Sequence, residues 1–97
     1  MALYITYVKW TEQGIRNIKD TVKRVEQASA AAEKAGGRLV GVWWTQGQYD
    51  IVGVWDLPDD ETASALILTV ALAGNVRSET VRAYDRDEMQ RILEKLP

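Results

Sequence analysis

The sequence contains no cysteine and no histidine. Without cysteine there is no disulfide framework, no thiolate nucleophile and no zinc–sulfur site. Without histidine the chain lacks the usual general base near neutral pH and the imidazole that commonly ligates haem iron or catalytic zinc. We therefore expect no bound metal, no haem and no other cofactor.

A basic cluster is also missing. The chain carries 12 Lys and Arg against 14 Asp and Glu, for a net charge of −2. Nucleic-acid-binding domains usually present a concentrated positive surface. We expect no nucleic-acid partner.

Long apolar runs are absent as well. The longest, residues 63–73, is interrupted by Ser64 and Thr69 and is too short to cross a hydrocarbon layer of about 30 Å. Residues 1–10 lack the basic start and continuous apolar stretch of a signal peptide. We expect a cytoplasmic protein with no membrane partner.

What is present is an ordinary globular composition. The chain has 97 residues, 46% of them hydrophobic and 27% charged. This length suits one domain over residues 1–97, with one modest core.

The first half of the chain predicts a strand and a helix. Residues 2–9 are rich in β-branched and aromatic residues at both odd and even positions. This pattern favours a central strand covered on both faces. Thr11 is a helix cap, and glycines 36 and 37 suit a helix end. The apolar stripe of the helix between them is Ile15, Ile18, Val22, Val25, Ala28 and Ala32.

Residues 38–45 and 49–56 predict two strands joined by residues 46–48, a short hairpin loop. We expect Thr45 to pair with Tyr49. A shift of one residue in this pairing would exchange the two faces of one strand.

That pairing places Trp43 opposite Ile51 and Gly41 opposite Gly53. It predicts a smooth aliphatic face that packs under the helices and a second face with larger side chains. The first face is Val8, Val40, Val42, Val52, Val54 and Val81, and the second is Leu3, Ile5, Tyr7, Trp43, Ile51 and Trp55.

The second half predicts a helix, a strand and a final helix. Acidic residues in the segment 58–61 favour a helix start, and residues 74–75 suit its end. Residues 76–85 alternate with enough polarity for an edge strand. Asp85 and Glu88 have the spacing of a capping box before a last short helix, whose apolar stripe is Met89, Ile92, Leu93 and Leu96.

This order predicts an α+β, ferredoxin-like βαββαβ domain with an extra C-terminal helix. Two helices cover one face of its four-stranded antiparallel sheet. The other face is also apolar, so we expect a homodimer formed sheet against sheet, with a higher oligomer as a further possibility. The alternative is that loops or the last helix cover this face.

Five segments carry a resemblance to a known family: 9–15, 17–20, 45–50, 58–60 and 74–80. Together they resemble the GYD domain family, whose name describes a Gly-x-Tyr-Asp turn, here Gly47, Tyr49 and Asp50. The resemblance covers essentially the whole chain and implies the dimeric α/β barrel architecture. The family has no established activity. Its members often place proline where this chain has Val22, so we expect the first helix to extend further back here.

The hairpin turn supplies the first candidate ligand-binding residues. Asp50 beside Tyr49 suits anchoring of a ligand amine or sharing of a proton. The alternative is structural: Gly47 supplies the turn, Asp50 bonds loop amides and Tyr49 packs.

Five further candidates lie on the strands. Trp43 and Trp55 suit a flat apolar pocket, with Ser78 and Thr80 as polar contacts, or else core and dimer packing. Arg82 suits a carboxylate in the space between two sheets, or else serves as edge-strand charge. We expect the pocket near the 47–50 turn and a small planar or aliphatic ligand, neutral or anionic.

Three functions remain open from the sequence. The first is a homodimeric small-molecule binding or sensing module, since ligand-sensing domains of leucine-responsive regulators have a similar Gly-x-Tyr-Asp hairpin. The second is a cofactor-independent small enzyme of monooxygenase or isomerase type, which the resemblance to the dimeric α/β-barrel superfamily implies. The third is a purely structural interaction protein.

Overall fold

One four-stranded antiparallel sheet organises the chain, in a computed structural model that describes residues 1–97. The strand order is β2-β3-β1-β4, which places the N-terminal strand beside the C-terminal one. The elements are β1 (Ala2–Trp10), α1 (Glu12–Arg16), a 3-10 turn η1 (Ile18–Asp20), α2 (Thr21–Lys34), β2 (Arg38–Trp44), β3 (Ile51–Leu57), α3 (Asp60–Leu72), β4 (Val76–Ala83) and α4 (Arg86–Glu94). The predicted α+β ferredoxin-like fold is confirmed.

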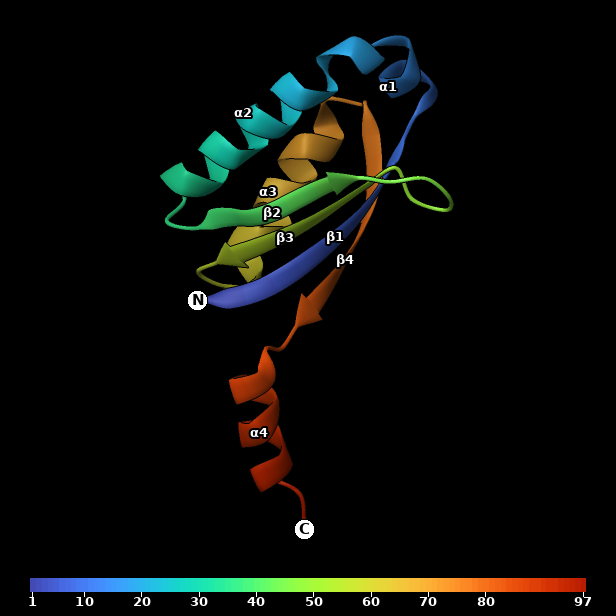
Figure 1. Cartoon of the computed structure of the whole chain (residues 1–97). Coiled ribbons are helices and arrows are strands. Elements are labelled where there is room, and N and C mark those ends of the chain that lie inside the picture. The colour runs from blue at the N-terminus through green and yellow to red at the C-terminus, as the bar shows by residue number, and fades with distance from the viewer.

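Helices α2 and α3 lie over the same face of the sheet, and the opposite face is left open (Figure 1). Helix α4 covers neither face. It projects away beyond the end of β4, which makes the chain elongated, with extents of 52 × 31 × 18 Å (Figure 1). No helix combines the length and apolar character needed to span a membrane.

The first helix is interrupted, contrary to the expectation that it extends further back. Thr11 caps α1 as predicted, but the helix ends at Asn17 and α2 begins only at Thr21. The cause is a contact with the α3–β4 loop, where the Thr11 amide donates to the Asn75 carbonyl at 3.0 Å. A methyl group on Gly14 would lie 2.0 Å from the same carbonyl oxygen. This close packing fixes the direction of α1 and forces a turn before α2.

The predicted hairpin register is wrong by one residue. Trp44 lies opposite Ile51, so Trp43 faces Val52, and the strands are joined by residues 45–50. The Thr45 amide donates to the carbonyl oxygen of Asp50 rather than of Tyr49. Gly41 accordingly lies opposite Val54, and Gly53 opposite Val42, after an irregularity between Leu39 and Gly41.

The physical reason for the slip lies in Asp50. Its amide donates to the Val8 carbonyl at 2.8 Å, and its carboxylate accepts from the Trp10 amide at 3.0 Å. Asp50 is therefore held against β1, and β3 begins at Ile51, two residues later than predicted.

The face assignment changes with the register. Ile51 and Trp55 lie on the helix side of the sheet, because both line a cavity together with residues of α2 and α3. Val8 and Val42 share that side, as predicted. The open face carries Leu3, Ile5, Tyr7, Trp43, Val52, Val54 and Val81. The three valines of this set were predicted to lie under the helices, and that prediction is wrong.

The core is small and lies toward one end of the sheet. Four buried residues form it: Tyr4, Ala32, Leu57 and Ala63. The small side chains of Ala32 and Ala63 let α2 and α3 approach the strands here. Only 8 of the 97 residues are buried, so much of the apolar surface lies outside this cluster.

Candidate functional site

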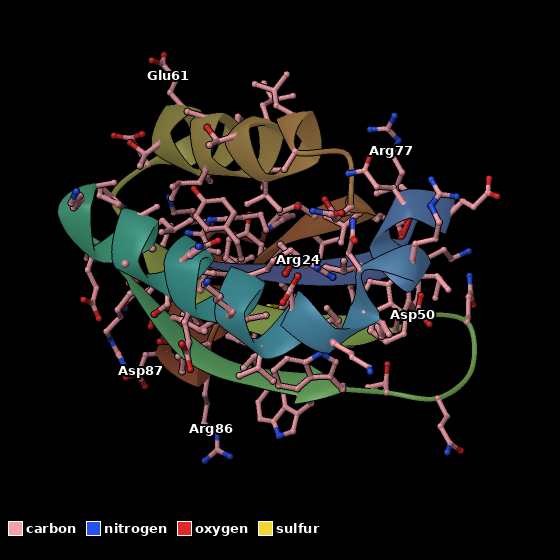
Figure 2. All side chains as sticks on the ribbon, turned by 90° about the horizontal axis from the view of Figure 1, so that it is seen from above. Arg24, Asp50, Glu61, Arg77, Arg86 and Asp87 are labelled. Atoms are coloured by element: carbon pink, nitrogen blue, oxygen red, sulfur yellow. The ribbon has the colours of Figure 1, made fainter.

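A cavity of about 340 Å³ lies between helices α2 and α3 and the covered face of the sheet. Figure 2 looks onto this region and shows the two helices side by side above the strands. The sheet supplies the floor, including Thr6, Val8 and Trp55, and the helices supply walls that include Val25 and Leu66. Most of the lining is hydrophobic, with 15 of 23 residues. The cavity therefore suits an apolar molecule.

The floor owes its shape to a glycine beneath an indole. A methyl group on Gly53 would lie 2.9 Å from Nε1 of Trp55, so only glycine leaves room for the ring. That nitrogen donates to Oγ1 of Thr6 at 3.1 Å. The hydrogen bond fixes the indole across the strands as a flat apolar surface.

Tyr4 forms part of the closed end. Its hydroxyl donates to a carboxylate oxygen of Asp60 at 2.5 Å. Burial, followed by this hydrogen bond, raises the pKa of Tyr4 to about 12. The Tyr4 hydroxyl therefore keeps its proton well into the alkaline range, and it donates that proton to the hydrogen bond with Asp60.

Arg24 is the single charged residue in the lining. The side chain lies between α2 and α3 over the sheet (Figure 2). Its Nη1 donates to the carbonyl of Asn17 at 2.7 Å, at the break before α2. Its Nη2 is buried and has no hydrogen-bond partner.

Arg24 was missed as a candidate from the sequence. A signal existed for Arg24, because Thr21, Arg24, Ala28 and Ala31 recur at three- and four-residue steps and so share one helix face. The apolar stripe predicted from the sequence passes instead through Val22, which is 53% exposed.

Two of the predicted site residues do line the cavity. Trp55 lies in its floor, and Ser78 borders it from β4. Thr80 is near this side of the sheet, opposite Thr6, but is not part of the lining, and its Oγ1 is buried without a partner. Trp43 lies on the open face of the sheet and is 56% exposed.

The hairpin candidates serve structure rather than the cavity. Tyr49 lies with its ring centroid 5.0 Å from that of Tyr7, on the open face, and its hydroxyl donates to Glu79 at 3.0 Å. The hydrogen bond to Glu79, followed by desolvation, raises the pKa of Tyr49. Asp50 binds the backbone of β1, in keeping with the structural interpretation. No residue of the 45–50 loop lines the cavity, although Ile51, which directly follows the loop, does so.

Arg82 lies near the junction with α4, not in a space between two sheets. It pairs with Tyr4 across the strands, and its Nη2 lies 3.1 Å from a carboxylate oxygen of Glu88. That hydrogen bond is the main cause that raises the pKa of Arg82. The pKa of Glu88 is lowered by the backbone amide of Asp85 and then by Arg82. The carboxylate that Arg82 holds is thus one of its own chain.

The acidic residues at the start of α3 act as a helix cap. Asp59 accepts a 2.7 Å hydrogen bond from the Thr62 amide, which lowers its pKa. No group of three or more acidic side chains is arranged to hold a metal ion.

Comparison with known families gives one match along almost the whole chain. The model of the GYD domain matches residues 4–93. This confirms the resemblance that the five segments suggested. No curated protein matches the chain.

Solved structures share the fold. The protein TTHA0845 from Thermus thermophilus is 21% identical, with a TM-score of 0.54 over 88% of this chain and 95% of that one. A structural-genomics protein, YJCS, is 12% identical, with a TM-score of 0.54 over 89% of this chain and 100% of that one. At these identities the likeness concerns the fold alone.

Proposed function

We propose, from the premise that the chain belongs to the GYD domain family, that it is a homodimeric module that binds or senses a small apolar molecule. The observation that carries this proposal is the cavity between α2, α3 and the sheet. Its volume of about 340 Å³ falls within the range of roughly 300–1,000 Å³ common for ligand pockets. An apolar lining with a few placed polar groups is likewise typical of such pockets.

The lining favours binding over catalysis. It contains no carboxylate, and the hydroxyl of its one tyrosine, Tyr4, already donates to Asp60. A group that accepts a proton near neutral pH is the usual requirement of general base catalysis. We therefore place the enzyme hypothesis second, since no contact in the cavity supports it specifically.

The open face of the sheet supports the homodimer. Its cross-strand neighbours Ile5, Val54 and Val81 form an apolar row, and Trp43 at one side is 56% exposed. No loop or helix of the same chain covers this face (Figure 1). Large exposed apolar surfaces on single chains commonly mark interaction sites. A second copy laid sheet against sheet buries the same residues on both chains by symmetry.

Native mass spectrometry of freshly purified protein tests both parts of the proposal together. We expect a species of twice the chain mass, with a bound small molecule retained under gentle conditions. A dimer that binds no member of a panel of apolar small molecules would support the interaction-protein hypothesis instead. A monomer would remove the dimer from the proposal.

The cavity is tested separately by tryptophan emission. An apolar ligand should shift the emission of the wild-type protein through Trp55, which lies in the floor. Replacement Trp55→Leu should remove most of that shift and weaken binding. Replacement Trp43→Phe is the control, because Trp43 lies on the open face of the sheet, outside this lining, and phenylalanine keeps an aromatic ring there.

A further inference from the structure

We infer that Arg24 makes this cavity selective for a ligand with one carboxylate group and an apolar body. The inference rests on the proposed function and names the chemical class of its ligand. Arg24 is the one charged side chain among the 23 lining residues, and no acidic residue joins it there. A cation alone in an apolar lining attracts an anion more strongly than a cation in water does.

Arg24 has unused hydrogen-bonding capacity. Neither ion pair in the structure involves it, since these join Arg16 to Glu12 and Arg82 to Glu88. Its Nη1 is occupied by the Asn17 carbonyl, and its Nη2 is buried without an acceptor. Buried donors are nearly always paired in native structures. An oxygen atom of a bound molecule would supply the acceptor that Nη2 of Arg24 lacks.

The shape of the guanidinium group favours a carboxylate. Its planar arrangement of N–H donors matches the two oxygens of a carboxylate, which accept parallel hydrogen bonds. A phosphate dianion fits less well, because the lining offers it only a single positive charge. Thr21, Asn75 and Ser78 add neutral polar groups to the same lining.

The remainder of the cavity specifies an apolar ligand body. The indole of Trp55 forms a flat floor, and Val25, Leu66 and Ile67 form the walls. A ligand with its carboxylate at Arg24 therefore places a hydrocarbon or aromatic group against these side chains. Arg24 thus selects the charged group of the ligand, and the apolar lining buries the rest of the molecule.

Arg24 also has a purely structural contact, the hydrogen bond to Asn17 at the helix break. The test must separate the two roles. A structural role affects charged and neutral ligands equally, whereas a selecting role affects only the charged one. The measured quantity is therefore the ratio of two affinities, not one affinity.

Isothermal titration calorimetry with decanoate and decanol measures this ratio on the full chain. We expect wild-type protein to bind decanoate about tenfold or more tightly than decanol. Replacement Arg24→Gln should abolish that preference while leaving decanol affinity within about twofold. Replacement Arg24→Lys, which keeps the charge, should retain part of the preference. Lys23→Gln is the matched control, because it removes a positive charge from an exposed neighbour and should leave both affinities unchanged.

The outcomes separate the inference from the proposed function. Equal affinity of wild-type protein for decanoate and decanol overturns the role of Arg24 but keeps the cavity as a binding site. An unchanged preference in Arg24→Gln does the same. If neither probe binds, and wild-type tryptophan emission responds to neither, both the inference and the proposed function fail.

Discussion

The indole of Trp55 occupies the space that a side chain at Gly53 would need. The same relationship joins Trp43 to Gly41, where an added methyl group would lie 2.7 Å from the ring. The first pair faces the cavity and the second faces away from the helices. Each face of the hairpin thus carries a tryptophan lying over the glycine two residues before it, and the two faces can be tested independently.

Replacement Gly53→Ala should displace the Trp55 indole. The new methyl group would lie 2.9 Å from Nε1 of Trp55 and 3.0 Å from Oγ1 of Thr6. We expect a loss of about 1–3 kcal/mol in unfolding free energy, typical of an overpacked site, with weaker ligand binding. Chemical denaturation and fluorescence titration measure the two effects. Gly41→Ala should disturb Trp43 but leave ligand affinity intact, and equal affinity losses in both variants would contradict the assignment of faces.

Replacement Trp43→Glu should separate the two subunits. In the dimer we propose, it places an uncompensated charge between the sheets, at a penalty of about 3–5 kcal/mol. Sedimentation velocity should then show a monomer or an aggregate. Gln46→Glu introduces the same charge in the exposed loop and should leave the dimer intact. A stable Trp43→Glu dimer would show that association uses another surface.

The ion pair at the start of α4 should be visible in a pH titration. The pKa of Glu88 lies below its ordinary value of 4.5, because the Asp85 amide and Arg82 stabilise the carboxylate. The folded state therefore gains stability from ionised Glu88 above that ordinary value and loses it as the pH falls through the lower, folded-state pKa. In Arg82→Gln, NMR titration of Glu88 should give a higher midpoint than in wild type.

Arg86→Gln is the control for that titration, because Arg86 lies on the same helix without an ion pair. Its Glu88 midpoint should match that of the wild type. Hydrogen exchange should also become faster in α4 when Arg82 is replaced, since Arg82 links β4 to Glu88. An unaltered midpoint and unaltered exchange would mean that the ion pair does not hold α4.

Replacement Gly14→Ala should destabilise the junction between α1 and the α3–β4 loop. Its methyl group would lie 2.0 Å from the Asn75 carbonyl oxygen, which is backbone and cannot rotate away. We expect a loss on the order of 1–3 kcal/mol and a lower Tm, measured by thermal denaturation. A Tm equal to that of the wild type would indicate that the loop moves freely.

The start of α3, the start of α4 and the ends of α2 and α3 were accessible from the sequence because their causes are local. Asp59 and Asp85 cap the helices that follow them, and Asp85 forms the expected reciprocal pair with Glu88. Gly36 and Gly74 adopt positive φ near helix ends, where other residues would be strained. Each signal depends on residues only a few positions apart.

The hairpin register could not be predicted in the same way. It depends on Asp50 binding the backbone of Val8 and Trp10, on a strand about forty residues earlier. No residue pattern within the hairpin itself indicates that Asp50 bonds to β1. A slip of one residue was enough to misplace Ile51 and Trp55 on the opposite face.

The candidate site was predicted only in part for a related reason. The break at Asn17 separates the phase of α2 from that of α1, so Ile15 and Val22 are exposed although they continue the apparent stripe. Arg24 faces inward as a result. A charged residue on a helix is usually solvated, and only its contacts in the folded chain indicate otherwise.

Helix α4 has 9 residues, fewer than the roughly 12–15 at which an isolated helix becomes even marginally stable in water. Its capping box and the Arg82 ion pair support only its first turn. Met89 and Leu93 on the helix, and Leu96 just beyond its end, remain exposed. If a surface of a second subunit packed against these side chains, the folding of α4 would depend on formation of the dimer. Helical content would then rise with protein concentration, and circular dichroism of a dilution series would report subunit association without any label.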